Sequence, residues 1–311
     1  MPEPARDAPA PLVLINPAAA GGRGARMAPA IQQWLQSHAA AQLHVPSSPE
    51  AAHDLLLRAP PRSRVVLVGG DGTLHKSLPA LVAQQHSVGL VPLGSGNDTA
   101  RALGLLGTRW QQALQWALTG PSSAMDLGRC HANGRSWYFA SSLAAGFDAS
   151  VGLRALRGPR WLRGLPRYLW ATLLELSQLQ CHAMQVFHEE TLWHQGPCLF
   201  VSVLNTATYG GGMPAVPHAQ HNDGHLDAVI AGHLGRRATA LLLPRLLAAR
   251  HLSHPRVHTR RLQSLRVACE HPIALAGDGE PLAQSGSWRV ESCPGALPVV
   301  HGPAQRMPRG S

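Results

Sequence analysis

The sequence has 311 residues, which is long enough for two domains with sizeable cores and excludes a small disulfide-stapled scaffold. Its 27 lysines and arginines outnumber 17 aspartates and glutamates. The formal net charge of +10 divides into +3 for residues 1–150 and +7 for residues 151–311. This excess predicts an anionic partner: a nucleic acid, an anionic membrane or a phosphorylated substrate.

Cysteine usage and the start of the chain indicate the compartment. The five cysteines are widely spaced and form no C-x-x-C pair, which indicates reduced thiols in a cytoplasmic protein. The opening MPEPARDAPAP has acids and prolines where a secretory signal needs basic and apolar stretches. No stretch approaches the about 18 apolar residues of a spanning helix. We therefore expect a protein that is soluble, or at most peripheral to a membrane.

In the first hundred residues, an apolar run ends three times in a glycine- or turn-rich corner and is followed by a helical pattern. Strands that alternate with helices predict a parallel α/β sheet, whose ligands bind beyond the carboxyl ends of the strands. All three corners should therefore face one crevice. The expected strands are Pro11–Ile15, Arg64–Val68 and Val88–Leu93; the corners are Ala18–Gly24, Gly69–Thr73 and Gly94–Asp98; the helices are Met27–His38, one that ends near Leu81, and Thr99–Leu105.

From about Met125, strand-like runs follow one another with few helices, which predicts a mainly antiparallel second domain. The expected strands are Trp137–Ala145, Met184–Trp193, Cys198–Asn205, Leu226–Ala231, Arg266–Leu275 and Trp288–Glu291, and the expected helices lie near Leu169–Leu179 and Ala238–His251. The predicted domains are 1–125 and 126–291, followed by a disordered tail at 304–311.

Glycine-rich turns after strands expose backbone N–H groups, and the following helix adds its positive end, so these corners are suited to phosphate. Lys76, the only lysine, follows His75, which excludes the G-K-[S/T] of a Walker A loop. No V-A-I-K, H-R-D or D-F-G segment of a protein kinase occurs. The first corner also lacks the G-x-G-x-x-G of a Rossmann dehydrogenase.

Six motifs in order resemble the diacylglycerol kinase catalytic-domain family, specifically its bacterial soluble lipid kinases. They are Asn16-Pro17 with the following glycines, the G-G-D-G-T of Gly69–Thr73, the P-L-G-S-G-N-D of Pro92–Asp98, the glycine-rich Gly210–Pro217, the N-D-G-H-L-D of Asn222–Asp227 and the G-D-G-E of Gly277–Glu280. The resemblance runs collinearly over nearly the whole chain.

The resemblance implies an N-terminal three-layer α/β nucleotide domain similar to those of NAD kinases and phosphofructokinases, then an antiparallel β-sandwich lipid-substrate domain. About 292–303 would return to the first domain. It also implies ATP-dependent phosphorylation of a lipid hydroxyl, with Glu280 as general base and Asp71 as the essential acid near the phosphates and Mg²⁺. The implied nucleotide-binding residues are Asn16, Pro17, Gly69, Gly70, Asp71, Gly72, Thr73, Leu74, His75, Ser95, Asn97 and Asp98.

A second Mg²⁺ is implied in the sandwich domain, held by Asp223 with the carbonyls of Gln220 and His225. The nearby histidines also allow a zinc interpretation, but the turn at Gly224 favours oxygen ligands for Mg²⁺. The sequence departs from the family pattern at His75, where asparagine is frequent, and at Ser95, where threonine is. The family's adenine-side threonine has no clear counterpart, and Ser47 or Ser48 is the candidate.

Arginines recur every three or four residues between aromatic and leucine side chains in 154–170, which is typical of a segment at a membrane interface. Its glycines and prolines argue against one continuous helix and favour two short segments or a flap. The arginines are Arg154, Arg157, Arg160, Arg163 and Arg167. We expect a cytoplasmic enzyme peripheral to the anionic inner face of a membrane, with a membrane lipid as substrate and no nucleic acid. A homodimer is left open, as are two alternatives: an NAD-kinase-like enzyme and a catalytically silent lipid-binding regulator.

Overall fold

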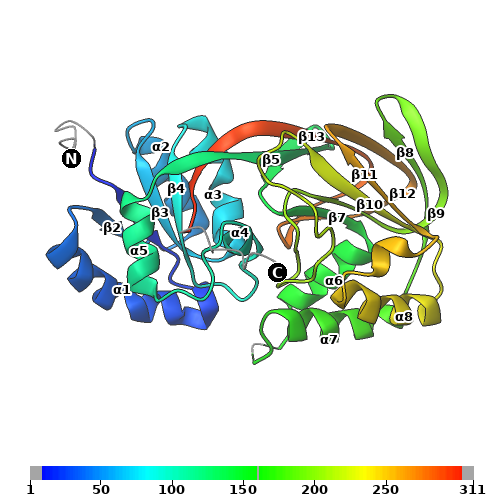
Figure 1. Ribbon diagram of the computed structural model, residues 1–311, viewed down its shortest axis with the longest axis horizontal. Helices are drawn as coiled ribbons and strands as arrows, with labels where there is room; N and C mark the ends of the chain where they lie inside the picture. Colours follow the sequence, from blue (N-terminus) through cyan, green and yellow to red (C-terminus); the bar gives the residue numbers. More distant parts are fainter. Residues whose placement is uncertain (1–8, 160, 303–311) are drawn as a thin grey trace, which may run out of the picture. The chain divides into compact units, whose positions relative to one another are not determined.

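The structure is a computed structural model that describes residues 9–159 and 161–302 (Figure 1). The chain forms two compact units. Unit 1 comprises the chain up to Gly94, Leu103–Ala124 and the segment from Leu297, and unit 2 comprises Ser95–Ala102 and Met125–Ala296. The strands β5 (Ser122–Ala132) and β13 (Glu280–Val300) run from one unit into the other. The tail expected at 304–311 lies outside the described residues.

Unit 1 is built on a parallel sheet with the strand order β2-β1-β3-β4, and the end of β13 pairs with β4 through Val299 and Val88. The strands are β1 (Leu12–Ile15), β2 (Gln42–His44), β3 (Arg64–Gly69) and β4 (Ser87–Pro92). This confirms the predicted parallel α/β domain. Because these strands are parallel, the segments that follow β1, β3 and β4 leave the same edge of the sheet.

The helices of unit 1 bury the faces of this sheet. They are α1 (Ala19–His38), α2 (Pro49–Arg58), α3 (Asp71–Ala83) and α5 (Trp110–Thr119). Alternate strand residues such as Val13, Val66 and Val91 share one core cluster with Ile31 of α1 and Leu114 of α5. Side chains of a strand alternate between the two faces, so this cluster defines one face of the sheet.

Unit 2 is mainly antiparallel, as predicted. Its strand order is β11-β10-β9-β7-β12-β13; in addition, β8 pairs with β9 and β12, and β5 pairs with β6 and β13. The remaining strands are β6 (Arg135–Phe139), β7 (Ser142–Gly146), β8 (His182–His188), β9 (Thr191–Leu204), β10 (Leu226–Gly232), β11 (Val257–Leu262) and β12 (Ser264–Gly277).

Two core clusters lie on opposite faces of these strands. Val201 of β9 and Ile230 of β10 belong to a cluster formed by strands, whereas Leu199 and Val229, on the same two strands, pack against helices. Those helices are α6 (Phe147–Leu156), α7 (Leu165–Leu176) and α8 (Arg236–Leu247), and Figure 1 shows them together on one side of the strands. A helix layer therefore covers one face of the unit 2 sheet.

Some details of the elements differ from the sequence-based expectation, and one agrees with it. The run expected as one strand at Trp137–Ala145 is two strands, because the backbone N–H groups of Ala140 and Ser141 donate to the carboxylate of Asp278 instead of extending a ladder. The short α4 (Asp98–Ala102) groups with unit 2 rather than with the first domain. The arginine-rich segment at 154–170 is not one continuous helix, as its glycines and prolines predict: it overlaps the end of α6 and the start of α7.

Candidate functional site

In unit 1, the first two corners are joined by a side-chain hydrogen bond. Asn16 follows β1, and its Nδ2 donates to the hydroxyl of Thr73 at 2.8 Å, while its Oδ1 accepts the N–H of Ala18 at 3.0 Å. The N–H of Asn16 also donates to the carbonyl of Val68 at 3.0 Å. The structure thus brings together the Asn16 and G-G-D-G-T motifs, which lie 57 residues apart in the sequence.

The G-G-D-G-T segment makes a close turn from β3 into α3. Gly70 is extended and precedes α3, and its carbonyl accepts the N–H groups of Thr73 and Leu74 at 3.0 and 3.2 Å. A Cβ on Gly69 would collide with the side chain of Thr73, so a larger residue does not fit there. Asp71 and Gly72 therefore lie in the first turn of a 13-residue helix, where backbone N–H groups and the helix dipole favour phosphate.

The other unit 1 candidates lie in α3, after β1 and at the start of α2. Leu74 and His75 are buried in α3, so their side chains lie in the helix packing and only their backbone belongs to the turn. Pro17 begins the glycine-rich corner, whose next residues Ala20, Gly21 and Gly22 have positive φ angles. Ser48 caps α2 by accepting the N–H of Ala51 at 3.2 Å. The assignment of Ser48 to the adenine side stays a prediction.

Ser95, Asn97 and Asp98 of the third corner lie in unit 2. Asp98 is nearly buried, and its carboxylate accepts the hydroxyl of Thr208 at 3.0 Å and the N–H of Gly211 at 2.8 Å. Burial raises the pKa of Asp98, and these hydrogen bonds and Arg101 oppose the shift. Asp98 therefore fixes the glycine-rich loop at 210–212 to the start of α4.

Glu280 is held at the end of a tight hairpin. Gly277 and Glu280 pair across β12 and β13, and the two residues between them, Asp278 and Gly279, have φ angles of 50° and 82°. Positive φ at both central residues is typical of a type I′ turn. The carboxylate of Asp278 accepts three backbone N–H groups, from Ala140 at 2.9 Å, Ser141 at 2.7 Å and Ser142 at 3.1 Å. Asp278 thus anchors the turn that carries Glu280.

Tyr168 of α7 lies between this hairpin and the glycine-rich loop. A Cβ on Gly279 would be 3.2 Å from the hydroxyl oxygen of Tyr168, and a Cβ on Gly210 would be 3.3 Å from its ring. Both glycines therefore let an aromatic ring approach the backbone closely. The hairpin of Glu280, the ring of Tyr168 and the loop held by Asp98 form one neighbourhood within unit 2.

Asp148 is a buried carboxyl that no sequence pattern singled out. It lies in the first turn of α6 and accepts the hydroxyl groups of Ser202 at 2.5 Å and Tyr209 at 2.9 Å. Burial raises the pKa of Asp148 and, with the neighbouring Asp148 carboxyl, holds the pKa of Tyr209 well above its usual value. Tyr209 precedes the glycine-rich loop, which is thus held by Asp148 on one side and Asp98 on the other.

The Asp148→Asn variant should change the pH dependence of stability. The folded-state pKa of Asp148 is raised, so folding takes up a proton as pH rises above the unfolded value of about 4. The wild-type protein should therefore lose free energy of unfolding as pH rises toward the folded-state pKa, and the asparagine variant should lack this loss. Urea unfolding from acidic to neutral pH measures the difference, and parallel profiles for the two proteins would contradict it.

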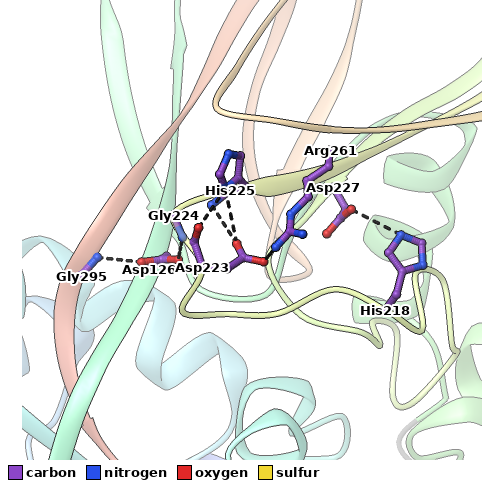
Figure 2. Close-up of polar contacts among 8 residues, drawn as sticks. All are labelled: Asp126, His218, Asp223, Gly224, His225, Asp227, Arg261 and Gly295. Atoms are coloured by element: carbon purple, nitrogen blue, oxygen red, sulfur yellow. Dashed lines mark hydrogen bonds and ion pairs between the residues drawn. The ribbon is translucent and has the colours of Figure 1, made fainter.

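The loop expected to hold a second Mg²⁺ is tied down by protein groups (Figure 2). Asp223 forms an ion pair with Arg261, and its Oδ1 accepts the N–H of His225 at 2.9 Å. The carbonyl oxygen of Asp223 lies 2.8 Å from Nδ1 of His225, and Gln220 is exposed. Among the described residues, no three or more His, Cys, Asp or Glu side chains are grouped to hold a metal ion. The Mg²⁺ assignment of these residues stays a prediction.

The arginine-rich segment divides into inward and outward side chains. Arg154 pairs with Glu175, and Arg167 donates to the carbonyls of Leu162 at 2.8 Å and Pro159 at 3.0 Å. Arg157 and Arg163 are exposed, whereas Arg160 lies outside the described residues. In the described part of the chain no helix is both long and apolar enough to cross a membrane.

Comparison with known proteins identifies the family. Residues 10–130 match the diacylglycerol kinase catalytic domain, and residues 141–301 match the YegS C-terminal NAD kinase beta sandwich-like domain. A diacylglycerol kinase of Mycobacterium tuberculosis is 32% identical over 237 residues, which cover 76% of each chain. The chain belongs to the diacylglycerol kinase family. It is a phosphotransferase of the lipid kinase class, and ATP is the phosphoryl donor that this class implies.

One further sequence comparison supports this family, and two solved structures share the fold. A Stenotrophomonas maltophilia protein named "Probable lipid kinase YegS-like" is 30% identical over 249 residues, covering 77% of this chain and 79% of that protein. A crystal structure of a diacylglycerol kinase from Bacillus anthracis superimposes with a TM-score of 0.70 at 16% identity, covering 95% and 97% of the two chains. An NAD kinase from Archaeoglobus fulgidus gives a TM-score of 0.53 at 13% identity over 95% and 94%. These folds confirm the expected α/β and β-sandwich class.

Proposed function

We propose that this protein is an ATP- and Mg²⁺-dependent lipid kinase that transfers the γ-phosphoryl group to the hydroxyl of diacylglycerol, phosphatidylglycerol or a similar lipid. The observation that carries the proposal is the presence of two family domains, each of which holds a candidate carboxylate on a turn fixed by hydrogen bonds. Asp71 lies in the first turn of α3, and Glu280 closes the hairpin anchored by Asp278.

The unit 1 turn supplies what nucleotide binding requires. Phosphoryl transfer depends on positioning and charge neutralisation more than on covalent participation, so backbone N–H groups, Mg²⁺ and one base suffice without a lysine. The carboxylate of Asp71 is a hard oxygen donor of the kind that Mg²⁺ prefers, and the glycines beside it leave room for phosphate. When bound, Mg²⁺ would neutralise phosphate charge, while Asn16 and Thr73 keep the turn in place.

The unit 2 hairpin would supply the base. The carboxylate of Glu280 would accept the proton of the lipid hydroxyl as that oxygen attacks phosphorus. Asp278, through its three backbone hydrogen bonds, would fix the position of Glu280. The glycine-rich loop held by Asp98 and Asp148 would shape the acceptor side.

An NAD-kinase-like activity is the second candidate, because the fold is shared with the Archaeoglobus enzyme. The lipid assignment is favoured because a diacylglycerol kinase is 32% identical over 76% of the chain, and because the TM-score to the Bacillus structure, 0.70, exceeds the 0.53 to the NAD kinase. The test is to incubate the protein with γ-labelled ATP, Mg²⁺ and separate vesicles containing diacylglycerol, phosphatidylglycerol or a sphingoid base, with NAD as a further acceptor. Label in one lipid identifies the acceptor, and label in NAD alone would overturn the proposal.

The lipid acceptor implies that the enzyme works at the cytoplasmic face of an anionic membrane. Support comes from exposed apolar side chains around α6 and α7: Trp161 is 79% exposed and Leu173 is 63% exposed. The exposed Arg157 and Arg163 lie close in sequence to Trp161. Aromatic rings and arginines in such combination favour an anionic lipid surface.

The double variant Arg157→Gln/Arg163→Gln should bind anionic vesicles roughly tenfold or more weakly than the wild type, since each cation contributes about 1 kcal/mol at such a surface. Vesicle sedimentation at low and high salt measures this. The matched control, Arg58→Gln/Arg62→Gln, removes two exposed arginines from unit 1 and should leave binding unchanged. Equal losses for both pairs would indicate a net-charge effect and contradict a docking role for α6 and α7.

A further inference from the structure

The Asp223 loop connects to its surroundings through two carboxylates, those of Asp223 and Asp126. Oδ1 of Asp223 accepts the N–H of His225, whereas Oδ2 is buried without a hydrogen bond and forms an ion pair with Arg261. Asp126 of β5 accepts the N–H of Gly224 at 2.6 Å and the N–H of Gly295 at 2.7 Å. Figure 2 shows this chain of contacts from Gly295 through Asp126 to the loop and on to Arg261.

The register of β11 on β10 places Arg261 at this position. In the β10 and β11 pair, Arg261 lies opposite Asp227, four residues after Asp223. Its side chain is 49% exposed, whereas that of Asp223 is 15% exposed, so the guanidinium reaches from solvent onto a largely covered carboxylate. A covered carboxylate needs a counter-charge to remain ionised without a large penalty.

A divalent cation fits this arrangement poorly. Mg²⁺ requires about six oxygen ligands in octahedral geometry, and the carboxylate of Asp223 is the charged donor at this loop. A guanidinium on the same carboxylate repels a second cation, and arginine does not deprotonate to relieve the repulsion.

We propose that Arg261 takes the place of a divalent cation at the Asp223 loop, so that unit 2 folds and holds this loop without bound metal. The ion pair supplies the positive charge, and the backbone hydrogen bonds to Asp126 supply the connection to β5 and β13. Metal dependence of the enzyme would then belong to the nucleotide alone.

The test is thermal unfolding of the full-length protein without nucleotide or lipid, in excess EDTA and in millimolar MgCl₂. The wild type should have the same unfolding midpoint in both. Arg261→Gln should lower the midpoint by about 2–4 °C, because it leaves a covered carboxylate without its counter-charge. In the double variant Arg261→Gln/Asp223→Asn the two effects should be strongly non-additive, since they remove one shared interaction.

The matched control is Arg260→Gln, which removes the neighbouring arginine, whose guanidinium lies 5.1 Å from the centroid of the Trp193 ring. It should show no coupling to Asp223→Asn. A wild-type midpoint that rises in MgCl₂, with the rise lost in Asp223→Asn, would overturn the proposal and identify Asp223 as a metal ligand. Additive effects of Arg261→Gln and Asp223→Asn would overturn it as well. If Arg261→Gln does not fold, the comparison of the wild type with Asp223→Asn still decides the question. Because no nucleotide or lipid is present, the outcome is independent of the proposed kinase function.

Discussion

Replacing Glu280 with glutamine should lower the rate of lipid phosphorylation at least about 100-fold while the protein remains folded, because a general base contributes about 10²–10⁴-fold. Glutamine keeps the size of the side chain and the hairpin between Gly277 and Glu280, but it cannot accept a proton from the lipid hydroxyl. The Michaelis constant for ATP should change little. Initial rates with γ-labelled ATP and lipid vesicles measure both quantities.

A matched control and a second variant accompany this prediction. Glu270→Gln, at an exposed position of β12, should leave the rate unchanged. Asp71→Ala should also lower turnover at least about 100-fold, because it removes the carboxylate from the first turn of α3. Near-normal turnover in both Glu280→Gln and Asp71→Ala would contradict the proposed mechanism.

Asp278→Ala should lower the free energy of unfolding by about 2–4 kcal/mol, which is a large loss for a marginally stable protein. The variant leaves the backbone N–H groups of Ala140, Ser141 and Ser142 without their carboxylate acceptor. Ser141 and Ser142 are buried residues, so water cannot readily replace the lost carboxylate as hydrogen-bond acceptor. Chemical denaturation monitored by circular dichroism gives the difference.

The same change should displace the hairpin that carries Glu280, so activity should fall in the folded fraction as well. Asp278→Asn keeps one acceptor oxygen and should lose less stability than the alanine variant. An alanine variant with wild-type stability would show that the three hydrogen bonds do not anchor the turn. Full activity of a destabilised variant would show that the turn position does not govern Glu280.

Short-range patterns in the sequence predicted much of the fold. Apolar runs ending in glycine-rich corners predicted β1, β3 and β4, because strand periodicity and turn chemistry are local properties. The rhythm change at about residue 125 predicted the antiparallel second half. Helix α6 was not predicted, since Gly152 interrupts its apolar pattern.

Long-range contacts were beyond the sequence. The Asp278 carboxylate reaches residues more than 130 positions earlier in the chain, and no local pattern marks Asp278 as an anchor. Asp148 gave no signal either, because an acid in a helical first turn is usually a solvated residue. The carboxylate of Asp98 likewise accepts hydrogen bonds from Thr208 and Gly211, which lie over a hundred residues away.

Strand register explains why Arg261 was also missed. The sequence suggested only that Asp223 and its neighbours resemble a metal-binding turn. The contact with Arg261 depends on the register in which β11 pairs with β10. A one-residue shift of that register would place the side chain of Arg261 on the other face of the sheet. The arginine-rich segment shows the same limit, since spacing alone does not show that Arg154 and Arg167 are used within the structure.

The most direct test of lipid kinase activity is a single competition reaction. The protein is incubated with γ-labelled ATP, Mg²⁺, vesicles of total bacterial lipid and NAD together, and the labelled products are separated and identified by mass spectrometry. We expect the label in a phosphorylated lipid, and its loss with Asp71→Ala and with Glu280→Gln. Label in NADP with none in lipid would contradict the assignment.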